Sequence, residues 1–381
     1  MTSTSMTDML LPVVEAVPFF RRAKVHVFGV TTTTATKPTK TKTAVKTATR
    51  VSGGQQVEEI EDQVEIEEPP QKKQKLQPDQ ATNKPQYDFP LFPNQANFEK
   101  DPNAPIPFRY LDAHQKEGPA RKATLESLQW RKQFQIDTIL SRPNPNYDVT
   151  KAILPHYFIG RSTTTNHVVF IQRPGLANME LAKHNNVQSQ DMSLQYAYVF
   201  EYCWNIMHPH ETAATDPDAL MIGILDMQGL HLGLLRKGDL ISFVKEFVGM
   251  IDAHYPTRGL KTYMINAPQW FNMVWKLVSP IMRESTKEKI VLYSAGDDQD
   301  EALLEALGPD MAATVMQALR IPDKKELKNK NKYDLSLTSD ILLETEMEQE
   351  IRSFVMKRLE QDGIEMKPVL SLADPKPTES S

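Results

Sequence analysis

The side chains whose types and spacing could support chemistry begin with Cys203, the single cysteine of the chain. One thiol excludes an internal disulfide, a C-x-x-C pair and a zinc site built from several thiolates. A phosphatase loop with a cysteine nucleophile needs an arginine six positions after the cysteine, and here that position is Pro209. We therefore expect a reducing, intracellular compartment and exclude that phosphatase class.

Two other groups of side chains could belong to a metal or catalytic site. His208, His210 and Glu211 are close enough in sequence to ligate a metal, but loop-forming residues follow them and favour a solvated turn. Asp226 ends an apolar run, at the end of a strand where α/β folds place ligands, and it could equally cap the next turn. A non-standard hydrolytic site around Asp226 and His231 is the one enzymatic alternative left open.

The common catalytic and nucleotide-binding signatures are absent from the sequence. It contains no G-x-S-x-G, no H-E-x-x-H, no P-loop and no G-x-G-x-x-G. We therefore expect no catalytic residue, no metal and no cofactor.

The elements that must position these side chains alternate between strands and helices. Apolar and β-branched runs predict strands at 167–172, 220–226, 262–266 and 289–293. Apolar residues at helical spacing predict helices at 194–207, 238–252 and 268–282. This alternation predicts an α/β sheet with parallel strands and right-handed crossovers.

The two ends of the chain differ in composition from this central part. Nearly half of the 27 prolines precede residue 120, and separate basic and acidic blocks occupy 21–50 and 57–68. Such blocks solvate rather than fold, so we expect 1–120 to be mostly a disordered arm. Lys72-Lys73-Gln74-Lys75 fits a short nuclear-import pattern, and a basic, Thr-rich organelle transit peptide is another open alternative.

Helices are expected on both sides of the alternating elements. A helix at 123–140 should begin the folded part of the chain, and a charged connector at 322–332 should lead to an amphipathic helix at 340–361. The apolar face of the second helix is predicted to hold Leu343, Met347, Ile351, Phe354 and Val355.

Composition limits the classes of partner. The 381 residues carry a formal net charge of −5 and are 40% apolar, which argues against bulk nucleic-acid binding. The longest apolar stretch, 262–275, contains Asn266 and Pro268 and is shorter than the roughly 18 to 20 residues that a membrane-spanning helix needs. We therefore expect neither a nucleic-acid partner nor an integral membrane protein.

The helix expected at 268–282 is apolar on most of its sides. Its large apolar side chains are Trp270, Phe271, Met273, Val274, Trp275, Leu277, Val278, Ile281 and Met282. A helix of this kind must be buried, or must face lipid on one side. A central core helix and a lipid-facing helix are both open at this point.

Four blocks around this helix resemble the CRAL-TRIO lipid-binding domain family. They occur in the family's order and spacing, with the sequences IGILDMQG at 222–229, HYPTRGLK at 254–261, YMINAP at 263–268 and STKEKI at 285–290. Upstream, Trp130-Arg131-Lys132 and Pro155-His156-Tyr157 are similar to the start of the family's domain. The resemblance covers about residues 123–310.

The resemblance implies a mixed, mostly parallel sheet with flanking helices and an apolar lipid pocket, which the helix after Asn-Ala-Pro covers as a movable gate. It also implies that a lipid headgroup binds to Arg258, Thr286 and Lys289, since a guanidinium, a hydroxyl and an ammonium can all donate to phosphate oxygens. The implied pocket and gate residues are Trp270, Phe271, Val274, Trp275, Val278 and Met282.

Two departures from the family pattern affect these expectations. Thr257 stands before Arg258, where members that bind inositol lipids commonly have an acid. Seven prolines between residues 85 and 119 leave room for only one helix of the family's N-terminal helical bundle. We therefore expect a remnant of that bundle at 123–145, the lipid-binding domain at 146–310, and the connector with its helix at 311–381.

Two functional hypotheses follow. In the first, a monomeric, non-enzymatic protein binds a phospholipid and transfers or presents it between membranes, with phosphatidylinositol or phosphatidylcholine as the candidate cargo. In the second, the protein is a lipid-sensing adaptor whose arm and C-terminal helix bind protein partners. Both hypotheses place the protein in the cytoplasm with transient contact to membranes, and nuclear or organellar targeting stays open.

Overall fold

The computed structural model describes residues 86–92, 95–208, 216–236, 239–319 and 343–374, all within one compact unit, Pro78–Ser381. Several predicted features lie outside the described residues, namely the arm up to residue 85 with its import pattern, the connector at 322–332, and His210 with Glu211. None of the described helices combines the length and the apolar composition that a bilayer crossing requires.

The described strands form one sheet whose spatial order follows the sequence. They are β1 (His156–Arg161), β2 (Val168–Gln172), β3 (Met221–Asp226), β4 (Gly259–Ile265) and β5 (Ile290–Leu292). β1 pairs antiparallel with β2, and the other pairs are parallel. The predicted mixed, mostly parallel sheet is therefore confirmed. β1 was not predicted as a strand, although its run of aromatic and β-branched residues suits one.

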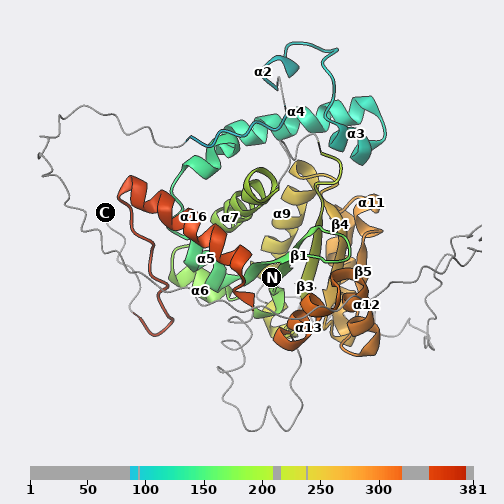
Figure 1. Cartoon of the computed structure of the whole chain (residues 1–381), viewed down its shortest axis with the longest axis vertical. Helices are drawn as coiled ribbons and strands as arrows, with labels where there is room; N and C mark the ends of the chain where they lie inside the picture. The colour runs from blue at the N-terminus through green and yellow to red at the C-terminus, as the bar shows by residue number, and fades with distance from the viewer. Residues whose placement is uncertain (1–85, 93–94, 209–215, 237–238, 320–342, 375–381) are drawn as a thin grey trace, which may run out of the picture. The chain divides into compact units, whose positions relative to one another are not determined.

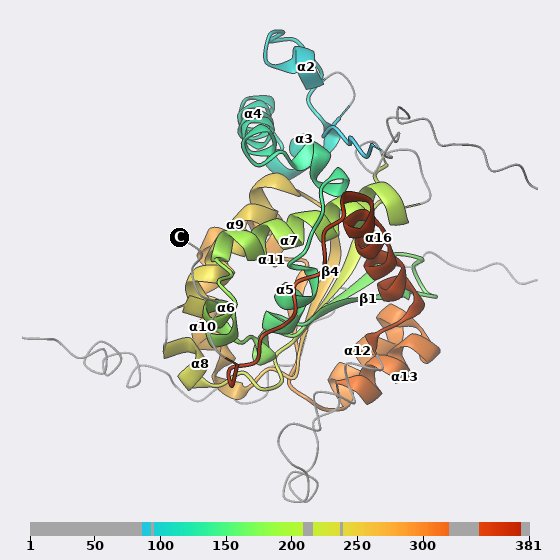
Figure 2. The same cartoon turned by 90° about the vertical axis from the view of Figure 1, so that its left-hand side faces the viewer.

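Alternation along the strands assigns the two faces of the sheet. In β2, Val168 and Phe170 belong to one core cluster, whereas Val169 and Ile171 belong to another. The second cluster is closed by α12 (Asp297–Leu307) and α13 (Pro309–Ala318). Because successive side chains of a strand point to opposite faces, the sheet lies between two helical layers. Figure 2 shows α12 and α13 on one side of the sheet and α7 to α10 on the other.

The other layer contains the longest helices of the central part. Its elements are α5 (Tyr147–Ile153), α6 (Met179–His184), α7 (Ser189–Tyr202), the π-helical turn Cys203–Met207, α8 (Leu232–Arg236) and α9 (Asp239–His254). A 3-10 turn, Pro174–Leu176, leads from β2 into this layer. The helix predicted at 238–252 is confirmed as α9, whose Leu240 and Phe243 are buried against the sheet side.

The segment 268–282, predicted to act as a gate and called the gate segment below, is not the single helix that was predicted. It consists of a 3-10 turn (Gln269–Phe271), the short helix α10 (Asn272–Val278) and a second 3-10 turn (Ser279–Ile281), followed by α11 (Glu284–Lys287). Pro280 explains why α10 ends at Val278, since proline has no backbone N–H to donate to the preceding turn of a helix.

The segment before residue 123 contains more helix than predicted. The structure has α2 (Gln95–Phe98), α3 (Phe108–His114) and α4 (Glu117–Phe134), followed by a 3-10 helix (Ile136–Ser141). The prediction of a single helix was wrong because the prolines stand where helices tolerate them. Pro107 is the N-cap of α3, and Pro119 lies in the first turn of α4, where backbone N–H groups have no partner inside the helix.

The predicted C-terminal amphipathic helix is confirmed as α16 (Glu346–Asp362), which lies beside α5 and β1 (Figure 1). Its Ile351, Val355 and Leu359 are fully buried in the core cluster of the α7 side. Glu348, 2% exposed, accepts hydrogen bonds from the Tyr147 hydroxyl at 2.9 Å and from the Phe158 backbone N–H at 2.8 Å, and pairs with the Lys151 ammonium. The apolar face of α16 therefore packs inside this fold.

Candidate functional site

A cavity of about 270 Å³ lies between the sheet and helices α9 and α10. Its floor is formed by the alternate β3 residues Met221, Gly223 and Leu225, whereas Ile222 and Ile224 point to the opposite core. Most of the wall is apolar, and α9 contributes Ile241, Phe243, Val244, Phe247, Val248 and Ile251. The sequence pattern of two-faced strands and an amphipathic helix thus produces an apolar chamber on one face of the sheet.

The gate segment closes one side of this cavity. Of the six residues predicted for the pocket or gate, Phe271, Val274, Trp275, Val278 and Met282 line the cavity. Trp270 does not line it, although it packs against the same apolar cluster.

The outer side of the gate segment is also apolar. Met273, Leu277 and Ile281 follow one another at four-residue spacing and are 50%, 55% and 40% exposed. Met273 and Leu277 share a face of α10, and Ile281 lies beyond the helix in the following 3-10 turn, so the gate segment has one side towards the cavity and exposed apolar residues on its outer side.

Polar side chains gather at the end of the cavity where β4 and β5 begin. All three residues predicted to hold a headgroup, Arg258, Thr286 and Lys289, line the cavity. The Lys289 ammonium donates to the backbone oxygen of Gly259 at 2.9 Å, and the Arg258 guanidinium donates to the backbone oxygen of Ala219 at 3.3 Å. Neither cation has a carboxylate within ion-pair distance among the described residues, so both retain donors for a ligand.

Two charged residues at this end were missed by the sequence analysis. Asp252, near the end of α9, accepts a hydrogen bond from the Thr286 hydroxyl at 2.8 Å and pairs with Arg283 at 3.2 Å. Asp252 and Arg283 both line the cavity. The sequence contained one signal for Asp252, namely an acid near the C-terminal end of a predicted helix. The helix dipole disfavours an acid at that end, so a compensating partner was to be expected.

Arg258 remains protonated at pH 7 although its surroundings lower its pKa. Its guanidinium carbon lies 4.6 Å from the centre of the Trp204 ring, a cation–π contact. Burial, and then the nearby charge of Arg109, lowers the pKa of Arg258 to about 9. That pKa is still above neutrality, so Arg258 is a cation at pH 7.

In the loop before Arg258, a hydrogen bond from the N-terminal helix α3 holds a strained residue, Thr257. Thr257 has a φ of 55°, a left-handed conformation that β-branched residues rarely adopt. Arg109 of α3, 5% exposed, donates to the backbone oxygens of Thr257 at 3.1 Å and of Ala219 at 3.1 Å. Strain of this kind persists only where surrounding contacts enforce it, so the N-terminal helices help to set the geometry of the cavity's polar end.

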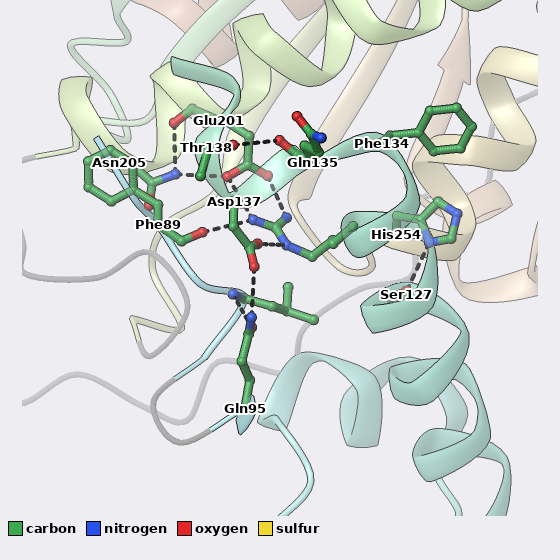
Figure 3. Close-up of polar contacts among 12 residues, drawn as sticks. Phe89, Gln95, Ser127, Phe134, Gln135, Asp137, Thr138, Glu201, Asn205 and His254 are labelled. Atoms are coloured by element: carbon green, nitrogen blue, oxygen red, sulfur yellow. Dashed lines mark hydrogen bonds and ion pairs between the residues drawn. The ribbon is translucent and has the colours of Figure 1, made fainter. Parts of the chain in front are cut away.

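A second group of buried charges joins the N-terminal helices to the same loop region. The Arg131 guanidinium donates to Asp137 at 2.5 Å, to Glu201 at 2.7 Å and to the backbone oxygen of Phe89 at 2.9 Å. Glu201 also accepts from the Tyr255 hydroxyl at 3.0 Å. Figure 3 shows the carboxylates of Asp137 and Glu201 and the backbone of Phe89 gathered around one guanidinium.

The residues first considered for chemistry are placed in closed environments. Asp226, fully buried, accepts from Arg173 at 3.1 Å, Asn266 at 2.8 Å and the Gln228 backbone N–H at 2.9 Å, and burial raises its pKa. Burial also raises the pKa of the Cys203 thiol to about 12. Both groups are therefore parts of the core rather than reactive centres.

Two of the three histidines considered for chemistry, His208 and His231, lie in the part of the chain that the structure describes, and neither belongs to a metal cluster there. His231 accepts a hydrogen bond from the Leu234 backbone N–H at 3.2 Å, and His208 lies 3.7 Å from Asp216. Within the described ranges, no group of three or more His, Cys, Asp or Glu side chains could hold a metal ion.

Comparison with known families and proteins agrees with the cavity-bearing part of the fold. Residues 155–313 match the CRAL/TRIO domain. The chain is 25% identical over 186 residues to the Sec14 cytosolic factor of Schizosaccharomyces pombe, covering 48% of this chain and 62% of that protein. It is 25% identical over 219 residues to the SEC14 cytosolic factor of Eremothecium gossypii, covering 56% and 68%.

A plant protein and a solved structure are similar to about half of this chain. The chain is 28% identical over 188 residues to the phosphatidylinositol/phosphatidylcholine transfer protein SFH12 of Arabidopsis thaliana, covering 48% of this chain and 33% of that protein. Among solved structures, that of Sfh5 matches with a TM-score of 0.40 and 15% identity, covering 53% of this chain and 65% of that one. The matched region thus spans about three fifths of the first Sec14 relative and a third of the plant protein.

Proposed function

We propose that this protein, whose residues 155–313 are a CRAL/TRIO domain, binds one phospholipid in the cavity and transfers or presents it between membranes. The observation that carries the proposal is the cavity itself, which is apolar along α9 and the gate segment and cationic at one end. Apolar walls suit acyl chains, and the Arg258 guanidinium and the Lys289 ammonium suit the phosphate that glycerophospholipids share.

The size of the cavity supports a moving gate. A volume of about 270 Å³ lies just below the roughly 300–1,000 Å³ of pockets for small ligands, so a lipid with two acyl chains requires the gate segment to move outward. The exposed residues Met273, Leu277 and Ile281 could enter a bilayer as the segment moves, which would offset the exposure of Phe271 and Trp275.

The names of the relatives support the choice of cargo. A phosphatidylinositol/phosphatidylcholine transfer protein and two cytosolic factors are among the proteins to which this chain is similar. We therefore propose phosphatidylinositol and phosphatidylcholine as cargo, and a cytosolic location with transient contact to membranes.

The test is the lipid content of the purified full-length chain. Native mass spectrometry after incubation with vesicles of phosphatidylcholine and phosphatidylinositol should detect one lipid per chain, and donor-to-acceptor vesicle assays should detect transfer. A chain that takes up neither lipid would disprove the proposed function. Uptake without measurable transfer would favour lipid sensing, the alternative hypothesis, over transport.

A further inference from the structure

The polar end of the cavity contains an element that a simple anion site does not need. Its charged lining residues are three cations, Arg258, Arg283 and Lys289, and one carboxylate, Asp252. A carboxylate beside a bound phosphate is repulsive unless a partner compensates for its charge or the ligand supplies donors to it. The position of Asp252 therefore bears on whether the part of the ligand beyond its phosphate carries hydrogen-bond donors.

The hydrogen bonds of Asp252 leave part of its capacity unused. One carboxylate oxygen, Oδ1, accepts from the Thr286 hydroxyl at 2.8 Å and lies 3.2 Å from the Arg283 guanidinium. Among the described residues no donor contacts the other oxygen, Oδ2, and the side chain is only 14% exposed. An ionised carboxylate can accept about four hydrogen bonds, so Asp252 can still accept from a ligand.

Arg283 fixes and neutralises this carboxylate. It also donates to the backbone oxygen of Asp252, and it lies 3.4 Å from the Nε2 atom of His114. The net charge of the cluster is +2, since three cations face one carboxylate. This charge favours an anionic ligand, and Arg283 next to the carboxylate repels a ligand ammonium.

From these contacts we infer that Asp252, held by Arg283, selects phospholipids whose headgroup carries hydroxyl donors beside the phosphodiester. The inference rests on the proposed function and deepens it. The cations hold the phosphate, while the free oxygen of Asp252 accepts from a headgroup hydroxyl. Choline has no hydrogen-bond donor, and phosphatidic acid has no alcohol hydroxyl beyond its phosphate, so neither can reach this oxygen with a donor while the cations hold the phosphate. An ethanolamine ammonium is repelled by Arg283.

The first test compares two anionic lipids in the full chain. The protein is incubated with phosphatidylcholine vesicles that contain equal amounts of phosphatidylinositol and phosphatidic acid, and the lipids that it retains are quantified. In Asp252→Asn the ratio of phosphatidylinositol to phosphatidic acid should fall by about tenfold or more, the range for hydrogen bonds to charged groups. The asparagine oxygen can still accept from Thr286, and thermal unfolding shows whether the fold is kept.

The control and the contrary outcomes separate this inference from the proposed function. Glu246→Gln, an exposed acid on the same helix that does not line the cavity, should keep the wild-type ratio. If the ratio of phosphatidylinositol to phosphatidic acid is unchanged in Asp252→Asn, including the case in which uptake of both lipids falls equally, the inference is overturned and the proposed function stands. Failure of the wild-type chain to bind any lipid would overturn both.

A second variant tests the repulsion of ammonium headgroups. Arg283→Met removes the cation beside Asp252, so uptake of phosphatidylethanolamine relative to phosphatidylinositol should rise several-fold. If wild-type protein already prefers phosphatidylethanolamine, Asp252 recognises an ammonium and the assignment to hydroxyl donors is wrong.

Discussion

Two groups of charges, one buried and one partly buried, lie close to the same loop, and they differ in how far their hydrogen bonds are satisfied. Arg131 directs its guanidinium to Asp137, Glu201 and the Phe89 carbonyl at 2.5 to 2.9 Å. Arg258 and Lys289 each have one backbone carbonyl, at 3.3 and 2.9 Å, and no carboxylate partner among the described residues. A fully paired buried cation has no donor left for a ligand, and its removal leaves its partners' charges uncompensated, whereas a cation with spare donors on a cavity wall is available to a ligand.

The residue types alone could not show which of the two groups is structural and which is free to bind a ligand. Both contain arginines close to aromatic side chains, and both involve residues that match the family pattern, Arg131 in one and Arg258 in the other. Only the partners distinguish them. The comparison predicts that substitutions in the Arg131 group reduce stability, and that substitutions at the cavity end change lipid binding with little effect on stability.

The largest expected effect is on stability, from Arg131→Met. The change leaves Glu201 buried without its cation, and breaking a buried ion pair in this way costs about 3–5 kcal/mol. Urea unfolding monitored by tryptophan fluorescence should show this loss, and the protein that stays folded should keep the wild-type preference among lipids. Lys132→Met, at the exposed neighbouring position, should change the free energy of unfolding by less than about 0.5 kcal/mol. Similar losses for both variants would contradict the distinction between the two groups.

The second effect is on binding, from Lys289→Ala. Loss of a charge-assisted hydrogen bond to the headgroup phosphate should weaken phosphatidylinositol uptake by about 1.5–3 kcal/mol and leave the unfolding midpoint nearly unchanged. Lys287→Ala is the matched control, because that ammonium pairs with Glu284 and does not line the cavity. A large drop in the unfolding midpoint for Lys289→Ala would place this lysine with the structural group.

The sequence predicted the parts of the fold that depend on local pattern. The four parallel strands, α9 and α16 follow from periodicity, and the resemblance to the family supplied Arg258, Thr286 and Lys289 as cavity residues. The end of α10 before Pro280 could have been inferred from the loss of a backbone donor. The domain boundaries predicted at residues 120, 146 and 310 stay predictions.

Other features depend on contacts between segments that are far apart in the sequence. Asp252 and Arg283 are 31 positions apart and pair only because the end of α9 meets the start of α11. Arg109 is 148 positions from Thr257, the residue whose carbonyl it holds. Periodicity describes one element at a time, so neither pair could be predicted from it.

The third effect concerns the gate and separates its two faces. Phe271 is only 4% exposed and lines the cavity, so an acid there would disturb the core as well as membrane contact. Met273→Ser with Leu277→Ser changes only the exposed outer side. If both half-exposed side chains enter a bilayer, vesicle binding should weaken by about 2 kcal/mol while lipid retention in solution stays unchanged. Sedimentation with vesicles measures the first quantity and native mass spectrometry the second.

The control for the gate lies on the opposite layer of the molecule. Leu304 of α12 is 47% exposed, which is similar to Met273, so Leu304→Ser removes a comparable apolar area away from the cavity. Vesicle binding should not change. An equal loss for this control would mean that general surface hydrophobicity, rather than the gate segment, determines membrane contact.

The last effect is a pH dependence of stability that involves His254, next to the Arg131 group. His254 stacks on Trp130 with ring centres 4.1 Å apart, and burial, followed by the charge of Arg131, lowers its pKa to about 4 from an ordinary value of 6.5. Between these two values the folded protein binds fewer protons at this site than the unfolded chain. The free energy of unfolding should therefore fall as the pH decreases from 6.5 towards 4, by at most about 1.4 kcal/mol per pH unit for one proton.

His254→Phe isolates this contribution because it keeps a ring on Trp130 and removes the titrating group. Loss of the contact between the Ser127 hydroxyl and the His254 ring, 2.9 Å in the wild type, lowers stability by a similar amount at every pH. The slope of stability against pH is therefore the informative quantity.

Urea unfolding at several pH values between 7 and 4.5 should give a shallower decline of the free energy of unfolding for the variant than for the wild type. Some decline should remain, because burial also lowers the pKa of His156, to about 3. Arg258, with a pKa of about 9, stays protonated throughout this range, so its charge at the cavity end is constant. Identical slopes for wild type and variant would show that His254 is not held neutral by its surroundings.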